Sequence, residues 1–90
     1  MGTAILKIKI MPESPTADLS KIQEEAQKII EDNKGSNLRF EKEPVAFGLV
    51  ALIATFMMDE SIPTDDFEEN LKQLKDISSV SVIDFRRAFG

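Results

Sequence analysis

An uncharged and mostly apolar run from Val45 to Met58 constrains the fold of this chain more than any other feature. A helix that crosses a membrane needs about 20 apolar residues, so this shorter run is expected to be a core element. Gly48 and the β-branched Val50 and Ile53 favour a strand over a helix. Because both sides of that strand would be apolar, we expect it at the centre of a sheet. Its outer face is then either covered or used to bind a partner.

Three other segments alternate apolar and polar residues with the period of two that is typical of strands. The first is residues 4–11, which ends at Pro12. The second is residues 38–44, and the last is residues 80–85. The alternation turns Lys7 and Lys9 away from the core, so we expect them to be solvent-facing strand lysines.

Two segments carry apolar residues every three or four positions, which predicts helices. The first runs from residue 17 or 18 to 32, with Thr16 or Asp18 as its cap and a stop at Asn33 and Gly35. The second is expected to have Thr64 as its cap and acidic residues in its first turn, where the helix dipole favours negative charge. Its apolar stripe comprises Phe67, Leu71, Leu74 and Ile77.

The resulting order is β-α-β-β-α-β over residues 1–90, which are too few for a second domain. Each β-α-β crossover is right-handed, so both helices cover the same face of a four-stranded antiparallel sheet. This is the ferredoxin-like α+β arrangement, with the first and third strands at the centre.

Composition removes most kinds of chemistry. The chain has no Cys and no His, so thiol catalysis, thiolate zinc sites and histidine general bases are excluded. Its glycines fit no phosphate-binding loop, and its acidic stretch fits no calcium loop. The net charge of −5 argues against nucleic-acid binding. We therefore expect a cytosolic, monomeric binding module with no cofactor, no metal and no membrane contact.

The charge is unevenly distributed. The two segments that contain the predicted helices, residues 12–35 and 59–79, carry −3 and −5, whereas residues 80–90 carry +1. The sheet side and the C-terminal end are thus the less acidic parts. They would turn towards an electronegative partner.

Two features are candidate contacts. Phe47 lies between the second and third strands, where the core has no obvious need for it. It is either a partner contact or a loop residue folded back onto the sheet. Phe85, Arg86 and Arg87, followed by Phe89, are either interface anchors or a frayed tail.

The segment Pro44-Val45-Ala46-Phe47-Gly48-Leu49, the acidic turn after the third strand and the close Val80-Ser81-Val82-Ile83-Asp84-Phe85-Arg86-Arg87 resemble the elongation factor 1-beta family. The similarity covers residues 4–87 and is strongest to the short archaeal form, which corresponds to the C-terminal exchange domain of larger eukaryotic members. It implies a ferredoxin-like fold and guanine nucleotide exchange on elongation factor 1-alpha, the GTPase that delivers aminoacyl-tRNA.

The resemblance also implies roles for individual residues. Phe47 would contact the GTPase, and a basic residue two places after Phe85 would reach its magnesium site. That residue is Arg87, and Arg86 is the alternative. Eukaryotic members have lysine there and end one residue later, and arginine is not a neutral replacement for lysine.

Two other classes compete with the exchange factor. Small ferredoxin-like domains often pair edge to edge and bind metabolites at the seam. An RNA-recognition fold of the same topology would need aromatic residues on its central strands amid basic residues, and residues 4–11 contain no aromatic residue.

Overall fold

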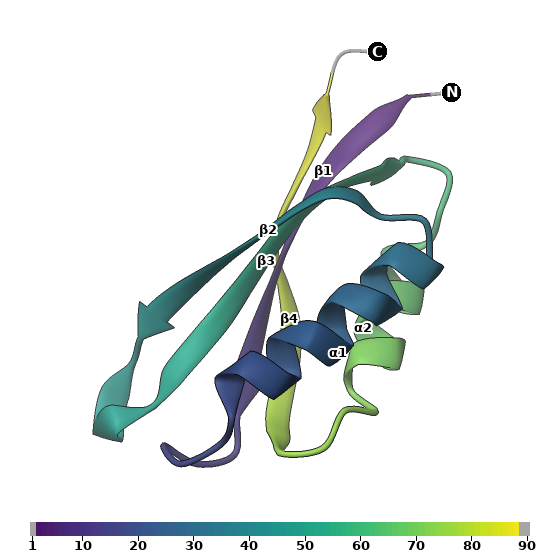
Figure 1. The fold of residues 1–90 in the computed structure, drawn as a ribbon. Helices are drawn as coiled ribbons and strands as arrows, with labels where there is room; N and C mark the ends of the chain where they lie inside the picture. Colours follow the sequence, from purple (N-terminus) through teal and green to yellow (C-terminus); the bar gives the residue numbers. More distant parts are fainter. Residues whose placement is uncertain (1, 89–90) are drawn as a thin grey trace.

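The computed structural model describes residues 2–88. The chain forms one four-stranded sheet and two helices, and both helices lie on the same face of the sheet (Figure 1). The elements in chain order are β1 (Thr3–Pro12), α1 (Leu19–Asp32), β2 (Ser36–Pro44), the 3-10 turn η1 (Ala46–Gly48), β3 (Val50–Asp59), α2 (Thr64–Leu71) and β4 (Ile77–Ala88).

The sheet has the strand order β2-β3-β1-β4, and every neighbouring pair is antiparallel. The predicted ferredoxin-like topology is therefore confirmed, with β1 and β3 at the centre. Within residues 2–88, no helix is long and apolar enough to cross a membrane.

The core lies between the helices and one face of the sheet. Leu6, Ile8 and Ile10 alternate along β1 and are almost completely buried on this face. The rings of Phe56 on β3 and Phe67 on α2 lie 4.9 Å apart between their centroids. Such a tilted pair adds about 0.5–1.5 kcal/mol to the free energy gained by burying the two rings.

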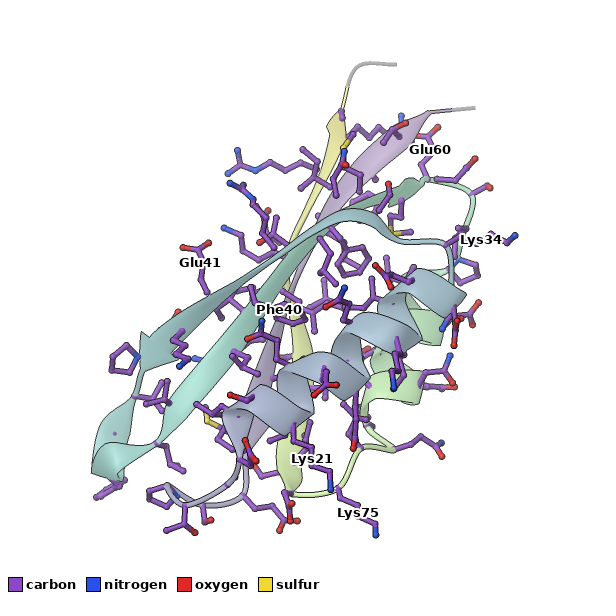
Figure 2. The ribbon with its side chains drawn as sticks, viewed as in Figure 1. Lys21, Lys34, Phe40, Glu41, Glu60 and Lys75 are labelled. Atoms are coloured by element: carbon purple, nitrogen blue, oxygen red, sulfur yellow. The ribbon has the colours of Figure 1, made fainter. Side chains whose placement is uncertain are left out.

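The other face of the sheet, called here the open face, has no helix over it (Figure 1). Even so, β3 buries Ala51 and Ile53 on this face, at 0% and 5% exposure. The predicted two-sided apolar character of β3 is thus confirmed. On the edge strand β2 the alternation is visible in Figure 2, where Phe40 points towards the helices and Glu41 points away from them.

The end of α1 is set by a left-handed residue. Asp18 caps the start of the helix by accepting a hydrogen bond from the backbone N–H of Lys21 at 3.2 Å. At the other end Lys34 has φ +72°, and the N–H of Gly35 donates to the carbonyl of Ile30 at 2.8 Å. This is the Schellman pattern. The helix therefore stops at the predicted Asn33 and Gly35, and the residue with positive φ is Lys34, which lies between them.

The helix α2 is shorter than its apolar stripe predicted. It ends at Leu71, with Pro63 rather than Thr64 as its N-cap and no side-chain cap bond. Leu74 therefore lies in the connection to β4, and Ile77 is the first residue of that strand. The prediction that the helix continues through Ile77 was wrong. Leu74 and Ile77 pack against the same core as Phe67 and Leu71, but they reach it from a turn and a strand.

The strand β4 is longer than predicted, and this changes the nature of the C-terminal residues. It starts at Ile77 and continues to Ala88, beyond the predicted end at Phe85. Arg86 and Arg87 are paired with Ile5 and Ala4 of β1, which excludes the alternative in which they form a frayed tail. Phe89 lies outside the described residues.

A first prediction concerns the turn after α1. A Cβ on Gly35 would lie 2.4 Å from Cγ2 of Ile30 and 2.9 Å from Cδ2 of Phe56. Gly35→Ala should therefore lower the free energy of unfolding by about 1–3 kcal/mol in urea denaturation. Lys34→Gly is the matched control, and it should leave stability unchanged or raise it by up to about 1 kcal/mol. A lower free energy of unfolding for Lys34→Gly than for Gly35→Ala would contradict this interpretation.

Candidate partner-binding site

Phe47 is presented at the tip of the β2–β3 connection. Its side chain is 93% exposed, which excludes the alternative in which the ring folds back onto the sheet. Its backbone is left-handed, with φ +62° and ψ +32°. The loop is closed by two backbone hydrogen bonds, from Val45 N–H to the carbonyl of Leu49 at 2.8 Å and from Leu49 N–H to the carbonyl of Ala46 at 3.2 Å.

This conformation of Phe47 is unfavourable on its own. A left-handed backbone at a residue other than glycine lowers the free energy of unfolding by roughly 1–2 kcal/mol. Because the Phe47 ring is exposed, it contributes little hydrophobic stabilisation to offset that cost. The fold thus spends stability to hold a large apolar side chain out in solvent. Such a combination is typical of a residue kept ready for a partner.

Phe85, Arg86 and Arg87 lie near the end of β4, and successive side chains there point to opposite faces of the sheet. Phe85 pairs with Leu6 and Arg87 with Ala4, both of which are buried on the helix side. Arg86 pairs with Ile5 and projects from the open face. The two arginines therefore cannot occupy the same place on a partner.

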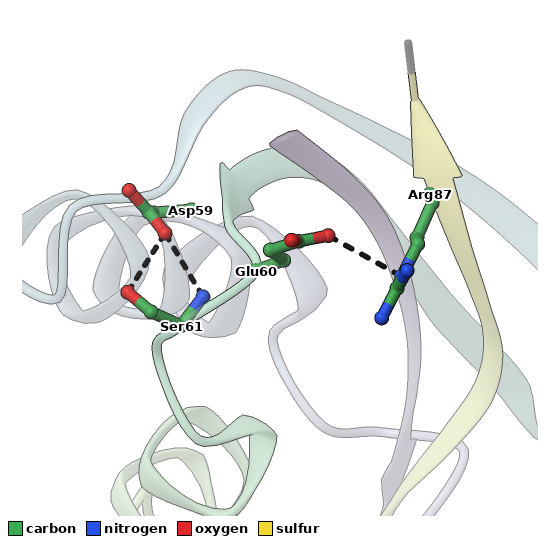
Figure 3. A network of polar contacts seen from close by, with 4 residues as sticks. All are labelled: Asp59, Glu60, Ser61 and Arg87. Carbon is green, nitrogen blue, oxygen red and sulfur yellow. Dashed lines mark hydrogen bonds and ion pairs between the residues drawn. The ribbon is translucent and has the colours of Figure 1, made fainter. Parts of the chain in front are cut away.

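Each arginine has its own carboxylate. Nε of Arg86 lies 3.0 Å from Oδ2 of Asp84, two residues earlier on the same face. Nε of Arg87 lies 3.3 Å from Oε2 of Glu60, which follows β3 (Figure 3). Both guanidinium groups remain mostly in solvent, since their side chains are 77% and 79% exposed.

The structure does not bring all the predicted site residues together. Phe47 lies just before the first residue of β3. Arg87 lies near the last residues of β3, because β3 and β4 both pair with β1 and Arg87 and Met58 both lie opposite Ala4. The ten residues of β3 span about 33 Å. Figure 1 shows the β2–β3 connection and the end of β4 at opposite ends of the sheet. A single partner touched by both must therefore be large.

The acidic turn that follows β3 was expected from the sequence, but its contacts were not. Asp59 accepts two hydrogen bonds from Ser61, from the backbone N–H at 2.9 Å and from the hydroxyl at 2.7 Å (Figure 3). These bonds stabilise the charged carboxylate and lower the pKa of Asp59, although its exposure to water is high. The turn leaves Glu60 next to Arg87, 27 residues later in the chain, and no local pattern could show that proximity.

The open face lies between the two ends and is less acidic than the rest of the protein. By strand register its charged side chains are four basic and three acidic, which leaves a net charge of −6 for the remainder of the chain. Two apolar residues are exposed there, Ile5 at 37% and Ile83 at 47%. The charged set is Lys7, Lys9, Arg39, Arg86, Glu41, Glu43 and Asp84. The predicted asymmetry of charge is thus present in three dimensions.

Residues 5–88 match the family model described as the EF-1 guanine nucleotide exchange domain. The chain belongs to that family. Membership gives it a guanine nucleotide exchange role in translation elongation, as the resemblance implied.

Relatives named elongation factor 1-beta match at nearly full length. One from Haloarcula marismortui is 42% identical over 91% of this chain and 93% of its own. One from Methanothermobacter thermautotrophicus is 39% identical over 97% and 98% of the two chains, and one from Nanoarchaeum equitans is 38% identical over 90% and 100%. The chain is therefore similar in extent to these short archaeal proteins.

A second prediction follows from the Asp59 turn. The carboxylate of Asp59 should titrate below the ordinary aspartate range in a carbon-detected NMR titration, and Ser61→Ala should raise its pKa part of the way back. Because the folded-state pKa is depressed, the stabilisation by this carboxylate is complete above the unfolded-state pKa. It is lost as pH falls through the folded value. An unchanged Asp59 titration in Ser61→Ala would contradict the assignment.

Proposed function

We propose that the GTPase on which this domain acts is elongation factor 1-alpha, and that the domain touches it at two separated points. One point is Phe47 and the other is the end of β4 around Arg87. The single observation that carries the proposal is that a guanine nucleotide exchange domain presents two exposed residues, Phe47 and Arg87, on the same sheet. We further propose that the domain acts in the cytoplasm as a monomer.

Nucleotide exchange requires no nucleotide pocket, metal site or nucleophile in the exchange factor itself. In a GTPase, magnesium bridges the nucleotide phosphates to the protein. A guanidinium brought near that metal site competes with it electrostatically, and GDP binding weakens. By linkage, GDP weakens binding of the exchange factor by the same coupling free energy. GTP then occupies the emptied site by mass action.

Arg87 is the better candidate than Arg86 for the magnesium site. The two project from opposite faces, so only one of them can serve. Arg87 stands on the same face as Phe85, which is 43% exposed and supplies an apolar neighbour for docking. Arg86 instead adds to the charge of the open face, beside Asp84.

Phe47 fits the second point of contact. A ring that is already exposed and held by a closed loop loses little conformational freedom on binding. Aromatic anchors of this kind are enriched among the residues that dominate binding energy. We propose that Phe47 supplies affinity while Arg87 acts on the nucleotide.

A third prediction tests the exchange function and the role of Arg87. The protein should accelerate release of a fluorescent GDP analogue from elongation factor 1-alpha. Arg87→Ala should lower the maximal rate at least about tenfold, equivalent to a contact worth about 1.4 kcal/mol or more. Arg86→Ala is the matched control and should change that rate less than about twofold. No acceleration by the intact protein would contradict the proposed function, whereas equal effects of both variants would contradict only the choice of Arg87.

A fourth prediction separates the strain at Phe47 from its binding role. Phe47→Gly should raise the free energy of unfolding by about 1 kcal/mol, because glycine adopts positive φ without a penalty. Phe47→Ala removes the ring but keeps the strain. Both variants should raise the concentration needed for half-maximal exchange at least about tenfold. If Phe47→Gly binds as well as the natural protein, the ring has no role in binding.

A further inference from the structure

We infer that Glu60 is a positioning residue for Arg87, which it orients by binding the Nε side of the guanidinium while the two terminal amino groups stay available to the partner. The contact is the ion pair of 3.3 Å between Nε of Arg87 and Oε2 of Glu60. Within residues 2–88, this is the one ion pair that the Arg87 side chain makes. The inference rests on the proposed function of Arg87.

The position of Glu60 is fixed from two sides. Its backbone N–H donates to the carbonyl of Gly2 at 2.9 Å, which ties the turn to the start of β1. The paired bonds from Ser61 to Asp59 fix the turn itself (Figure 3). Glu60 is also the less exposed member of the ion pair, with 30% side-chain exposure against 79% for Arg87. Glu60 thus has an anchored backbone and the less exposed side chain of the pair, and Arg87 is the more exposed partner that it orients.

The absence of a side chain at Gly2 makes room for this carboxylate. A Cβ at Gly2 would lie 2.9 Å from both Cδ and Oε2 of Glu60. The end of the glutamate side chain would have to move, while the backbone would not. Gly2→Ala therefore displaces the carboxylate and keeps its charge, which gives a second way to disturb the ion pair.

The chemistry of the pair depends on Arg87 being an arginine. A guanidinium has five N–H donors in a planar fork, and binding through Nε leaves the four on the terminal nitrogens free. A lysine ammonium is a single point of charge. Glu60 would orient an arginine, but it would compete with the partner for a lysine. The same glutamate is thus expected to help exchange in one case and to hinder it in the other.

The test measures the maximal rate of GDP release from elongation factor 1-alpha at saturating protein. Glu60→Gln should lower this rate about two- to fivefold, the range that an exposed ion pair supports, with less change in the half-maximal concentration. Gly2→Ala should also lower the maximal rate of GDP release. In the Arg87→Lys background the sign should reverse, so that Glu60→Gln raises the rate. A purely structural role for Glu60 would not produce that reversal.

Asp84→Asn is the matched control, because it breaks the corresponding ion pair of Arg86 with the same change of charge. It should leave the maximal rate within about 1.5-fold of the natural protein. The positioning role is overturned if Asp84→Asn slows release as much as Glu60→Gln, if Glu60→Gln has no effect, or if Glu60→Gln does not raise the rate in the Arg87→Lys background.

A measurement without the GTPase separates this inference from the proposed function. In proton–nitrogen NMR spectra of the arginine Nε–H groups, Glu60→Gln should shift the Arg87 signal and leave Arg86 unchanged, whereas Asp84→Asn should do the opposite. If these shifts are seen but the protein accelerates no GDP release, the proposed function fails while the ion pair stands. If Glu60→Gln leaves the Arg87 signal unchanged, the inference itself fails.

Discussion

The packing of one face of the sheet against two short helices is the constraint on which the rest of the structure depends. Phe56 and Phe67 contact each other across that layer, and the buried residues of β1 fill the space along it. Only two helices are available, so the second face of the sheet stays open. That face nevertheless carries apolar side chains from β3. The fold is thus complete on one side and leaves a large, moderately charged surface on the other.

The central strand β1 determines the geometry of the candidate site. It pairs with β3 on one side and β4 on the other, and so places the end of β4 beside the turn that follows β3. Arg87 and Glu60 meet for this reason. The same pairing keeps Phe47 at the other end of β3, a strand whose ten residues span about 33 Å. The two proposed contact points on one sheet suit a function exerted on a large partner, in which the domain itself needs no nucleotide pocket.

Several properties of the fold could be predicted from local chemistry. The period of two in β1 and the two apolar faces of β3 follow from side-chain alternation, which any sheet must obey. The cap of α1 could be narrowed to Thr16 or Asp18, because such side chains accept free N–H groups at a helix start, and the structure selects Asp18. The apolar spacing after Thr64 was misleading, since Leu74 and Ile77 reach the same core from a turn and a strand. Periodicity reports which residues are buried more reliably than how the backbone buries them.

The order of elements, the apolar character of β3 and the candidate residues Phe47, Arg86 and Arg87 can be predicted from the amino-acid sequence, because they depend on residue types and local spacing. Three properties required the folded structure: the exposed, left-handed conformation of Phe47, the projection of Arg86 and Arg87 from opposite faces of β4, and the contact between Arg87 and Glu60. The placement of the two arginines and of Glu60 depends on strand pairing between residues far apart in sequence, which no local pattern encodes. The conformation of Phe47 depends on how the loop between β2 and β3 closes through Val45 and Leu49.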